Sequence, residues 1–413
     1  MNNQVPSVFQ AALARGLVSR RTAMAGMAGL TGVAAVTSLA ACGSAGKSST
    51  GGSAGGATTK ARVKAATDTS ATDKVVNWSN WPSYMDVNDK NKSHPTLDAF
   101  TKQTGIKVNY TEDYNDNDEF YAKVRPLLAA GVDTGRDMWV STDWMVARLV
   151  RLDYVQKFDL ANMPNHANIV DSLVNVPFDK GRLYSMPWQS GFAGIGWNPK
   201  STGGKKIETV DQLLTDPILK GKVTLLTEMR DTVGLVLLSL GKSLDSFTDA
   251  DFDAAIAEIQ KAKDSGQIKG FTGNEYTKPL AAGDTAACFA WTGDVVSLQA
   301  SNPLLGYALP EKGFTLWSDN FVIPNLAKHK KNAERLINYY YDPKVMAKVV
   351  EFINYIADVK GTKEVVTLDD PAAGKNQLIF PSPETLSRAH VFRGLTAAEE
   401  TKYNRKFQTL ITG

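Results

Sequence analysis

Cysteine and histidine are both scarce in this chain of 413 residues, which holds two of the first and four of the second. The cysteines are Cys42 and Cys288. Because Cys42 ends an N-terminal segment that predicts export, the folded body keeps one cysteine and cannot form an internal disulfide. No two of the four histidines have the spacing of metal ligands. We therefore expect no disulfide scaffold, no metal site and no cofactor.

The short motifs of common enzyme classes are missing as well. H-E-x-x-H, G-x-S-x-G and G-x-x-x-x-G-K-[ST] do not occur. The nearest approach to the last, Gly241-Lys242-Ser243, has Val236 where the motif needs glycine. The segment "GFAGIG" has the wrong spacing for a dinucleotide-binding loop. The absence of all these motifs favours a binding protein over an enzyme.

The chain also lacks an excess of charge that would attract nucleic acid. Its formal charge is +3, and residues 1–41 contribute three arginines and no acid to that value. The remaining residues hold 43 basic and 43 acidic side chains. A balanced body of this kind has no basic footprint, so we expect no nucleic-acid partner.

The first 42 residues predict an export signal rather than a part of the fold. Two arginines, Arg20 and Arg21, precede a stretch rich in Ala, Gly, Met and Val that ends in "LAAC". This ending resembles a bacterial lipobox, and we expect its cysteine, Cys42, to carry lipid. The twin arginine suggests export in a folded state, by the Tat route. The alternative is a transmembrane helix of about 19 residues, which the high glycine content disfavours.

Residues 43–73 predict a flexible linker between the lipid and the folded body. They include no aromatic residue and no large aliphatic residue beyond Val63. Such a segment cannot bury enough apolar surface to fold. We therefore expect the folded body to begin near Lys74 and the linker to act as a tether.

Short strands and helices alternate along the body, which is typical of α/β proteins. The first set predicts strands at 75–78, 106–112 and 136–142, and helices at 96–105, 119–131 and 143–153. In this set Thr142 is a predicted N-cap, and Pro126 predicts a break or kink. A second set of strands and helices follows, and further helices close the chain. We expect a mostly parallel sheet and two lobes with a cleft between them. The predicted lobes are residues 74–187 with 312–352, and residues 188–311 with the C-terminal helices in 353–413.

Aromatic and acidic side chains recur together where predicted strands end. The pairs are Trp81 with Tyr84, Glu228 with Asp231, Trp291 with Asp294, and Trp317 with Asp319. Each acid alone is also explained as a cap or first-turn acid of a helix, and each ring as a core aromatic. Ligands of open α/β sheets bind beyond the carboxyl ends of strands, so the recurrence favours one shared cleft. Carboxylates next to ring faces suit a positively charged ligand.

Eight segments of the body occur in an order that a known family shares. They are "NWPSY", "FTKQTGIKV", "RDMWVSTDW", "YSMPWQSGFAGIGWN", "LLTEMRDTVGLVLLSLGKS", "FAWTGDV", "WSDNFVIP" and "EFINY". From Val75 to Tyr355 the chain resembles the spermidine- and putrescine-binding proteins of bacterial ABC importers. The resemblance implies the two-lobed α/β fold of type II periplasmic binding proteins, which closes on a linear polyamine. It also implies ligand-binding roles for Trp81, Tyr84, Thr142, Trp144, Asp231, Trp291, Asp294, Trp317, Asp319 and Tyr355.

The first loop departs from the pattern of this family. Members often carry an acid immediately before the tyrosine, where this chain has Ser83, and Pro82 replaces a hydroxyl residue. A triamine needs an acceptor for each ammonium, so the departure favours a shorter ligand. We expect putrescine to bind at least as tightly as spermidine. Asp143 is an alternative source of the acid, and its other interpretation is a first-turn helix acid.

Three functions are compatible with these observations. The resemblance implies a lipid-anchored, monomeric solute-binding protein of the cell envelope that delivers a polyamine to an ABC permease and catalyses no reaction. The second is the same fold binding another cationic amine or an amine conjugate. The third is an exported hydrolase that uses Asp231 and Asp294 as paired carboxylates, although no third catalytic group accompanies them.

Overall fold

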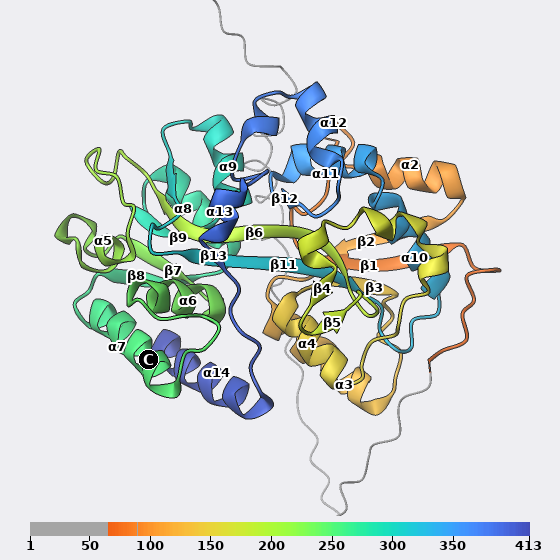
Figure 1. Cartoon of the computed structure of the whole chain (residues 1–413), viewed down its shortest axis with the longest axis horizontal. Helices are drawn as coiled ribbons and strands as arrows, with labels where there is room; N and C mark the ends of the chain where they lie inside the picture. The colour runs from red at the N-terminus through yellow and green to blue at the C-terminus, as the bar shows by residue number, and fades with distance from the viewer. Residues whose placement is uncertain (1–64, 89) are drawn as a thin grey trace, which may run out of the picture.

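One eleven-stranded sheet runs through the whole molecule and connects its two halves (Figure 1). The computed structural model describes residues 65–88 and 90–413. The predicted export signal, with Cys42, and most of the predicted linker lie outside the described residues. The main strands, in their order across the sheet, are β2 (Lys107–Glu112), β1 (Val75–Asn80), β3 (Met138–Thr142), β11 (Phe314–Val322), β6 (Met186–Trp197), β9 (Ala287–Trp291), β7 (Val223–Leu226) and β8 (Ile268–Thr272).

The sheet is parallel at its two ends and antiparallel in its middle. Strands β2, β1 and β3 pair in parallel, and so do β9, β7 and β8. The long central strands β6 and β11 pair antiparallel with each other and with β9 and β3. The expectation of a mostly parallel sheet is therefore correct for the three strands at each end of the sheet and wrong for the central strands β6 and β11. The reason is that β6 and β11 cross from one half to the other in opposite directions.

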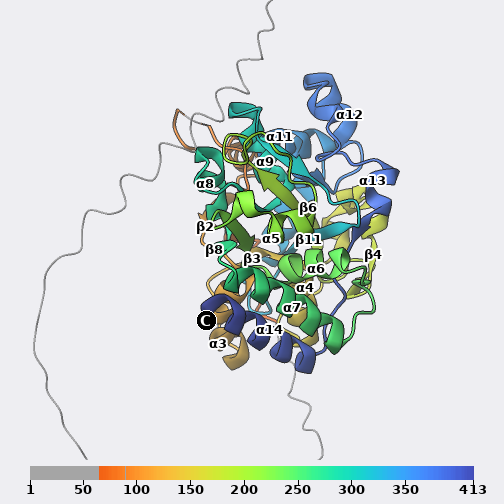
Figure 2. The ribbon, with the colours of Figure 1, turned by 90° about the vertical axis from the view of Figure 1, so that its left-hand side faces the viewer.

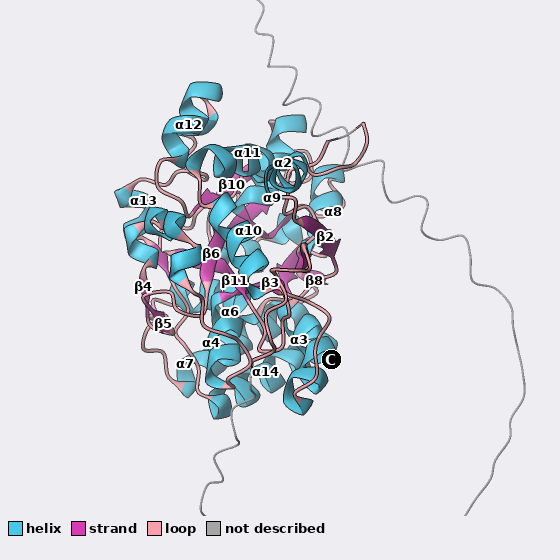
Figure 3. Ribbon diagram, turned by 90° about the vertical axis from the view of Figure 1, so that its right-hand side faces the viewer, coloured by secondary structure: helices cyan, strands magenta, loops and turns pink. Residues whose placement is uncertain are grey.

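Short strands and helices complete the fold. The short strands are β10 (Gly306–Ala308) and β12 (Ile356–Ala357) beside β6, β13 (Ala389–His390) beside β11, and the separate pair β4 (Asn175–Val176) and β5 (Asp179–Lys180). The helices are α2 (Pro95–Thr104), α3 (Asn117–Ala130), α4 (Asp143–Arg151), α5 (Val210–Thr215), α6 (Met229–Ser239), α7 (Asp249–Asp264), α8 (Thr277–Ala282), α9 (Thr292–Ser301), α10 (Lys330–Tyr340), α11 (Pro343–Ile353), α12 (Thr362–Asp369), α13 (Pro383–Ser387) and α14 (Ala397–Thr412). Views of the two ends of the molecule show helices on both sides of the strands (Figures 2 and 3). Over the described ranges, no helix has the length and apolarity that crossing a membrane requires.

Local sequence signals set the ends of the first helices. Helix α2 ends at Gly105, whose φ of 70° is the left-handed conformation that glycine adopts without strain. Asp116 caps α3 by accepting hydrogen bonds from two backbone amides of the first turn. Helix α3 continues through Pro126 to Ala130, so the predicted break is absent. The proline removes one backbone donor without ending the helix.

Buried apolar clusters define the two halves of the molecule. One cluster fills the second half around Phe252, and Tyr403 of α14 belongs to it. Two clusters fill the first half, around Trp78 and Trp139. The segment 353–380 contributes to the cluster of Trp78, for example through Val366. The bounds of the lobes remain a proposal, in which this packing places residues 353–380 with the first lobe rather than the second.

The folded body begins before Lys74, where the sequence analysis placed its start. The backbone N–H of Thr69 donates to the carbonyl of Lys328 at 2.7 Å. Ser70 is 2% exposed, and its hydroxyl accepts a hydrogen bond from the backbone N–H of Asn332 at 3.1 Å. These contacts are hydrogen bonds, and a prediction based on large apolar side chains could not have found them.

Candidate functional site

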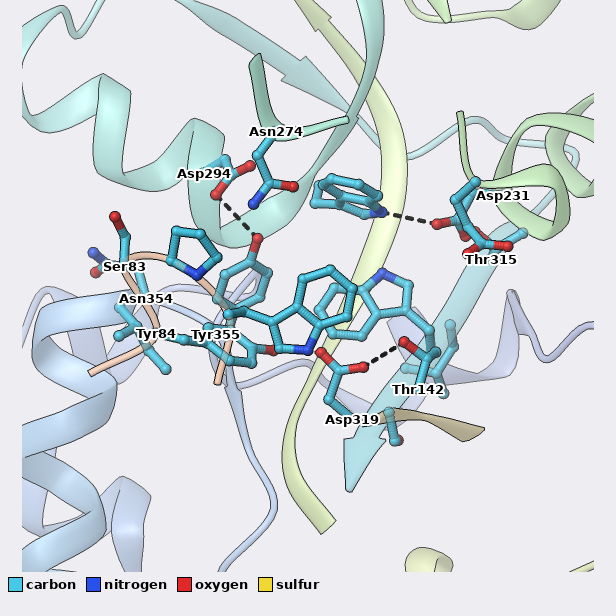
Figure 4. Close-up of a pocket in the computed structure, with 18 of the residues that line it drawn as sticks. Ser83, Tyr84, Thr142, Asp231, Asn274, Asp294, Thr315, Asp319, Asn354 and Tyr355 are labelled. Carbon is cyan, nitrogen blue, oxygen red and sulfur yellow. Dashed lines mark hydrogen bonds between the residues drawn. The ribbon is translucent and has the colours of Figure 1, made fainter. Parts of the chain in front are cut away.

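A cavity of about 1780 Å³ opens between the two halves and is lined by residues of both. The ten residues that the resemblance implied all line it: Trp81, Tyr84, Thr142, Trp144, Asp231, Trp291, Asp294, Trp317, Asp319 and Tyr355. Figure 4 shows several of them pointing into one space, although they come from distant parts of the chain. The structure thus brings these residues together, and their role toward a ligand stays a proposal.

Asp319 projects from β11 and is 5% exposed. One carboxylate oxygen accepts from Thr142 Oγ1 at 2.6 Å and the other from the Tyr84 hydroxyl at 3.0 Å. Thr142 occupies the predicted N-cap position of α4, but its side chain makes no capping bond because it donates to Asp319. Burial raises the pKa of the Asp319 carboxyl to about 7, although these two hydrogen bonds lower it. The charges of Asp143 and Asp231 raise the pKa further.

Asp294 lies in the first turn of α9 and is held by two tyrosines, of which Figure 4 shows Tyr355. Tyr276 donates to one carboxylate oxygen at 2.8 Å, and Tyr355 donates to the other at 3.1 Å. Burial raises the pKa of the Asp294 carboxyl to about 6, against the effect of both hydrogen bonds. The N-cap position of this helix is Trp291, not the acid. Asp294 is therefore oriented by two phenol groups, of which Tyr355 lines the cavity and Tyr276 is buried behind it.

Asp231 lies in the first turn of α6 and is 5% exposed. Thr315 Oγ1 donates to one of its carboxylate oxygens at 2.6 Å, and Trp291 Nε1 donates to the other at 2.8 Å. Burial is the largest cause of the raised pKa of this carboxyl. Trp291, which the sequence analysis paired with Asp294, therefore binds Asp231 of another segment instead.

A common arrangement links the three acids. Each carboxylate is held by two neutral donors, and at least one of the two lies 60 or more residues away in the sequence. Among residues 65–88 and 90–413, no lysine, arginine or histidine forms a salt bridge with Asp231, Asp294 or Asp319. Burying an ionised carboxylate is costly unless a cation accompanies it. The site is therefore suited to a positively charged ligand.

Aromatic rings form the wall between two of these acids (Figure 4). The ring of Tyr355 meets that of Tyr84 at 5.5 Å between centroids and that of Trp317 at 5.4 Å, both edge to face. The indole nitrogens of Trp81, Trp144 and Trp317 are buried without a hydrogen-bond partner. Such rings offer an apolar surface to an alkyl chain and an electron-rich face to a cation.

Acids outnumber bases in the wall of the cavity. Among the described residues, the wall includes thirteen aspartates and glutamates but only five lysines and arginines. The basic residues are Lys92, Arg230, Lys278, Lys348 and Arg393. A cleft lined mainly by one sign of charge focuses the electrostatic field and attracts ligands of the other sign. The near-neutral chain therefore contains a locally negative cavity.

The first loop contacts an acid, Glu112, although the loop itself has a serine at position 83. The backbone N–H of Ser83, at a φ of 62°, donates to Glu112 Oε1 at 3.1 Å, and Glu112 lines the cavity. Asp143 also lines the cavity, but its carboxylate accepts from Asn320 Nδ2 at 2.9 Å and from the N–H of Ser318 at 3.3 Å. Burial raises the pKa of the Asp143 carboxyl to about 6. Asp143 thus supports β11, and its contact with a ligand stays a prediction.

Two donors of the site were not predicted from the sequence. Tyr276 ends a short 3-10 turn before α8, in a segment without a recognisable pattern. Thr315 lies on β11 two residues before Trp317 and four before Asp319. Alternate residues of a strand share one face, so the spacing of these three side chains could have identified Thr315.

Comparisons with known proteins identify the family of the chain. Residues 96–376 match the family described as bacterial extracellular solute-binding protein. The spermidine/putrescine-binding periplasmic protein of Escherichia coli K12 is 27% identical over 335 residues, which cover 81% of this chain and 90% of that protein. The putrescine-binding periplasmic protein SpuD of Pseudomonas aeruginosa is 26% identical over 374 residues, or 86% of this chain and 97% of that protein.

A solved structure supports the fold in the same way. The spermidine/putrescine ABC transporter substrate-binding protein PotD of Streptococcus pneumoniae superimposes with a TM-score of 0.68, at 24% identity over 82% of this chain and 98% of that one. The two-lobed fold of periplasmic solute-binding proteins, expected from the sequence, is therefore confirmed. The matching family consists of transport proteins and not of enzymes, so the hydrolase alternative is not favoured. The family match spans more than half of the residues of the chain, so the chain belongs to the bacterial extracellular solute-binding protein family.

Proposed function

We propose that the protein captures a linear polyamine, putrescine or spermidine, in the cell envelope and delivers it to an ABC permease. The observation that carries the proposal is the pair Asp294 and Asp319. Both carboxylates line one cavity, both are held by neutral hydroxyl groups, and both have raised pKa values because they are buried. The relatives from E. coli and P. aeruginosa are named for these ligands, which adds support.

An alkyl diammonium has the chemistry that this cavity needs. Charge-assisted hydrogen bonds from each ammonium to a carboxylate are about twice as strong as neutral ones. The methylene groups lie against the rings of Trp317 and Tyr355, and a ring face attracts a nearby cation by about 0.5–2 kcal/mol. The ligand also neutralises acids that repel one another across the cleft, so binding favours the closed arrangement of the lobes.

We assign three roles to the residues of the site. The acceptors of the ammonium groups are Asp231, Asp294 and Asp319. The groups that orient these acceptors are Thr142, Tyr84, Trp291 and Tyr355. The aromatic wall for the carbon chain is formed by Trp81, Trp317 and the rings of Tyr84 and Tyr355.

Titration calorimetry of the purified protein with putrescine and spermidine tests the proposal. We expect Asp294→Asn and Asp319→Asn each to weaken binding by about 2–4 kcal/mol, the cost of leaving a desolvated ammonium unpaired. The matched control is Asp211→Asn, whose side chain is 71% exposed and outside the cavity wall, and which should bind like the wild type. Unchanged affinity in both site variants would remove these acids from the ligand site, and a wild-type protein that binds neither amine would refute the proposed ligand class.

The proposal extends to how the protein is held in the envelope. We propose that Cys42, which follows the predicted export segment, carries lipid and that the protein acts as a monomer without catalysis, cofactor or nucleic acid. In cells, Cys42→Ala should move the protein from the membrane fraction to the soluble fraction. A Cys288→Ala variant, which changes the buried cysteine of the body, should stay with the membrane. If Cys42→Ala remains membrane-bound after a high-salt wash, the lipid anchor is wrong.

A further inference from the structure

The protein places one of its own cations against an aromatic ring of the cavity. Arg230 lines the cavity next to the first turn of α6 and is 6% exposed. Its guanidinium carbon lies 3.7 Å from the ring centroid of Trp144. This is the position that a ligand ammonium would take over the same ring. The ring that the resemblance implied for the ligand is therefore covered by an arginine.

Two acids of the second half hold Arg230 in this position. Its Nη2 donates to Glu400 Oε1 of α14 at 3.2 Å, and its Nη1 lies 3.7 Å from Glu228 Oε1. Glu400 is shared, because Arg148 and Arg151 of α4 also reach its carboxylate, each at 3.0 Å. An arginine side chain fixed by such contacts cannot move aside for a ligand without breaking a buried ion pair.

Arg230 does not have an acid to itself. Three arginines share the single carboxylate of Glu400, while Arg148 also pairs with Asp118 at 2.7 Å and Arg230 with Glu228 at 3.7 Å. Burial raises the pKa of the Glu228 carboxyl, which favours its neutral form beside Arg230. This end of the cavity therefore presents a fixed cation, whereas Asp294 and Asp319 present carboxylates without one.

We propose that Arg230 is a specificity-determining residue that favours diamines over longer polyamines. Its guanidinium occupies the ring of Trp144 and repels an ammonium that extends beyond the region of Asp294 and Asp319. A diamine places both charges between those acids and does not reach Arg230. A triamine has to bring its third ammonium to the remaining acceptor, Asp231, whose carboxyl already feels the charge of the neighbouring Arg230. This inference rests on the proposed function and specifies its ligand.

The ratio of the dissociation constants for spermidine and putrescine, measured by calorimetry at pH 7.5, tests this role. We expect wild type to bind putrescine at least as tightly as spermidine, and Arg230→Met to shift the ratio toward spermidine by tenfold or more. Arg230→Lys keeps the charge and should keep the wild-type preference. A ratio separates the role of Arg230 from a general loss of stability, which would weaken both ligands alike.

The matched control is Arg148→Met. Arg148 is 8% exposed, reaches the same Glu400 carboxylate and lies 4.9 Å from the same Trp144 ring, but it does not line the cavity. Its replacement should leave the ratio within twofold of wild type. If Arg230→Met fails to fold, Arg230→Gln keeps donors for Glu400 without the charge and carries the same expectation.

The outcomes separate the inference from the proposed function. A ratio that changes less than twofold in Arg230→Met and Arg230→Gln would overturn the inference while leaving polyamine binding intact. An equal shift in Arg148→Met would also overturn it, because the effect would then belong to the arginine cluster as a whole. A wild-type protein that binds neither amine would instead overturn the proposed function.

Discussion

Polyamine binding should weaken as the pH falls below about 7, because the proposed acceptors are acids with raised pKa values. Burial raises the pKa of Asp319 to about 7 and that of Asp294 to about 6. A dication binds the ionised carboxylates, so bound protons have to leave before the ligand can bind. The amines themselves stay charged over this range, because an alkyl ammonium has a pKa of about 10. Affinity should therefore rise with pH and level off above about 7.

The magnitude follows from the two pKa values. At pH 8 about 90% of the Asp319 carboxyl groups and about 99% of the Asp294 groups are ionised, whereas at pH 5 the fractions are about 1% and about 9%. If both groups have to be ionised, the apparent Kd rises about 1000-fold between pH 8 and pH 5. Asp319 accounts for about 90-fold of this change and Asp294 for about tenfold.

Calorimetric titrations with putrescine from pH 5 to pH 8, at constant ionic strength, measure this dependence. Asp319→Asn should bind more weakly at pH 8 but keep only the dependence of Asp294, about tenfold over the range. The exposed control Asp211→Asn should keep the full dependence of the wild type. A wild-type affinity that changes less than tenfold between pH 8 and pH 5 would refute the conclusion that buried, ionised acids accept the ligand.

The stability of the ligand-free protein should show the opposite sign. A carboxyl whose pKa is raised in the folded state loses free energy of folding when it ionises, so ionised Asp319 destabilises the protein above about pH 7. As the pH falls from about 7 toward about 4, protonation of the folded state removes this penalty. Asp319→Asn should therefore raise the melting temperature at pH 8 more than at pH 5. Thermal unfolding followed by circular dichroism measures this difference, and a lower melting temperature of the variant at pH 8 would contradict it.

Two further predictions concern groups around the acids. Tyr276→Phe removes one hydroxyl donor to the Asp294 carboxylate and should weaken putrescine binding about five- to tenfold, the effect of one buried hydrogen bond. The control Tyr403→Phe removes a hydroxyl that donates to Asp249 of α7 and should leave binding unchanged. In Gly293→Ala, the added Cβ would lie 2.5 Å from ring atoms of Tyr355 and displace that ring, so binding should weaken tenfold or more. The control Gly270→Ala adds a Cβ that meets nothing within 4 Å and should bind normally. Calorimetry checks both pairs, and a site variant that binds as its control does would show that the displaced or deleted group does not support the acids.

Much of the chain could be predicted from local pattern. The order of strands and helices follows from short apolar runs, glycine stops and capping residues, each of which acts over a few residues. Gly105 ends α2 and Asp116 caps α3 because their backbone preferences and hydrogen bonds are local. The residues and the order of segments such as "FAWTGDV" and "WSDNFVIP" were enough to indicate the family, and the family match confirms it.

Predictions failed where a feature depends on contacts between distant segments. The sheet is antiparallel in its middle because β6 and β11 cross between the halves, and local alternation of strands and helices does not reveal that crossing. Pro126 stays inside α3, where the rest of the helix holds its backbone. The segment before Lys74 is part of the body because Thr69 reaches the carbonyl of Lys328, which lies 259 residues further along the chain.

For the candidate site, too, the sequence predicted some features and only the tertiary structure decided the others. The sequence alone placed Trp291 and Asp231 correctly at and after strand ends, because those positions follow from local secondary structure. It placed Trp317 and Asp319 at a strand end as well, but both lie inside β11. Only the tertiary structure decided that Tyr276 serves Asp294, that Thr142 turns from its helix to Asp319, and that an arginine covers Trp144. It also decided the raised pKa values, because the burial of a carboxylate depends on every segment that packs around it, and no single stretch of sequence contains that sum.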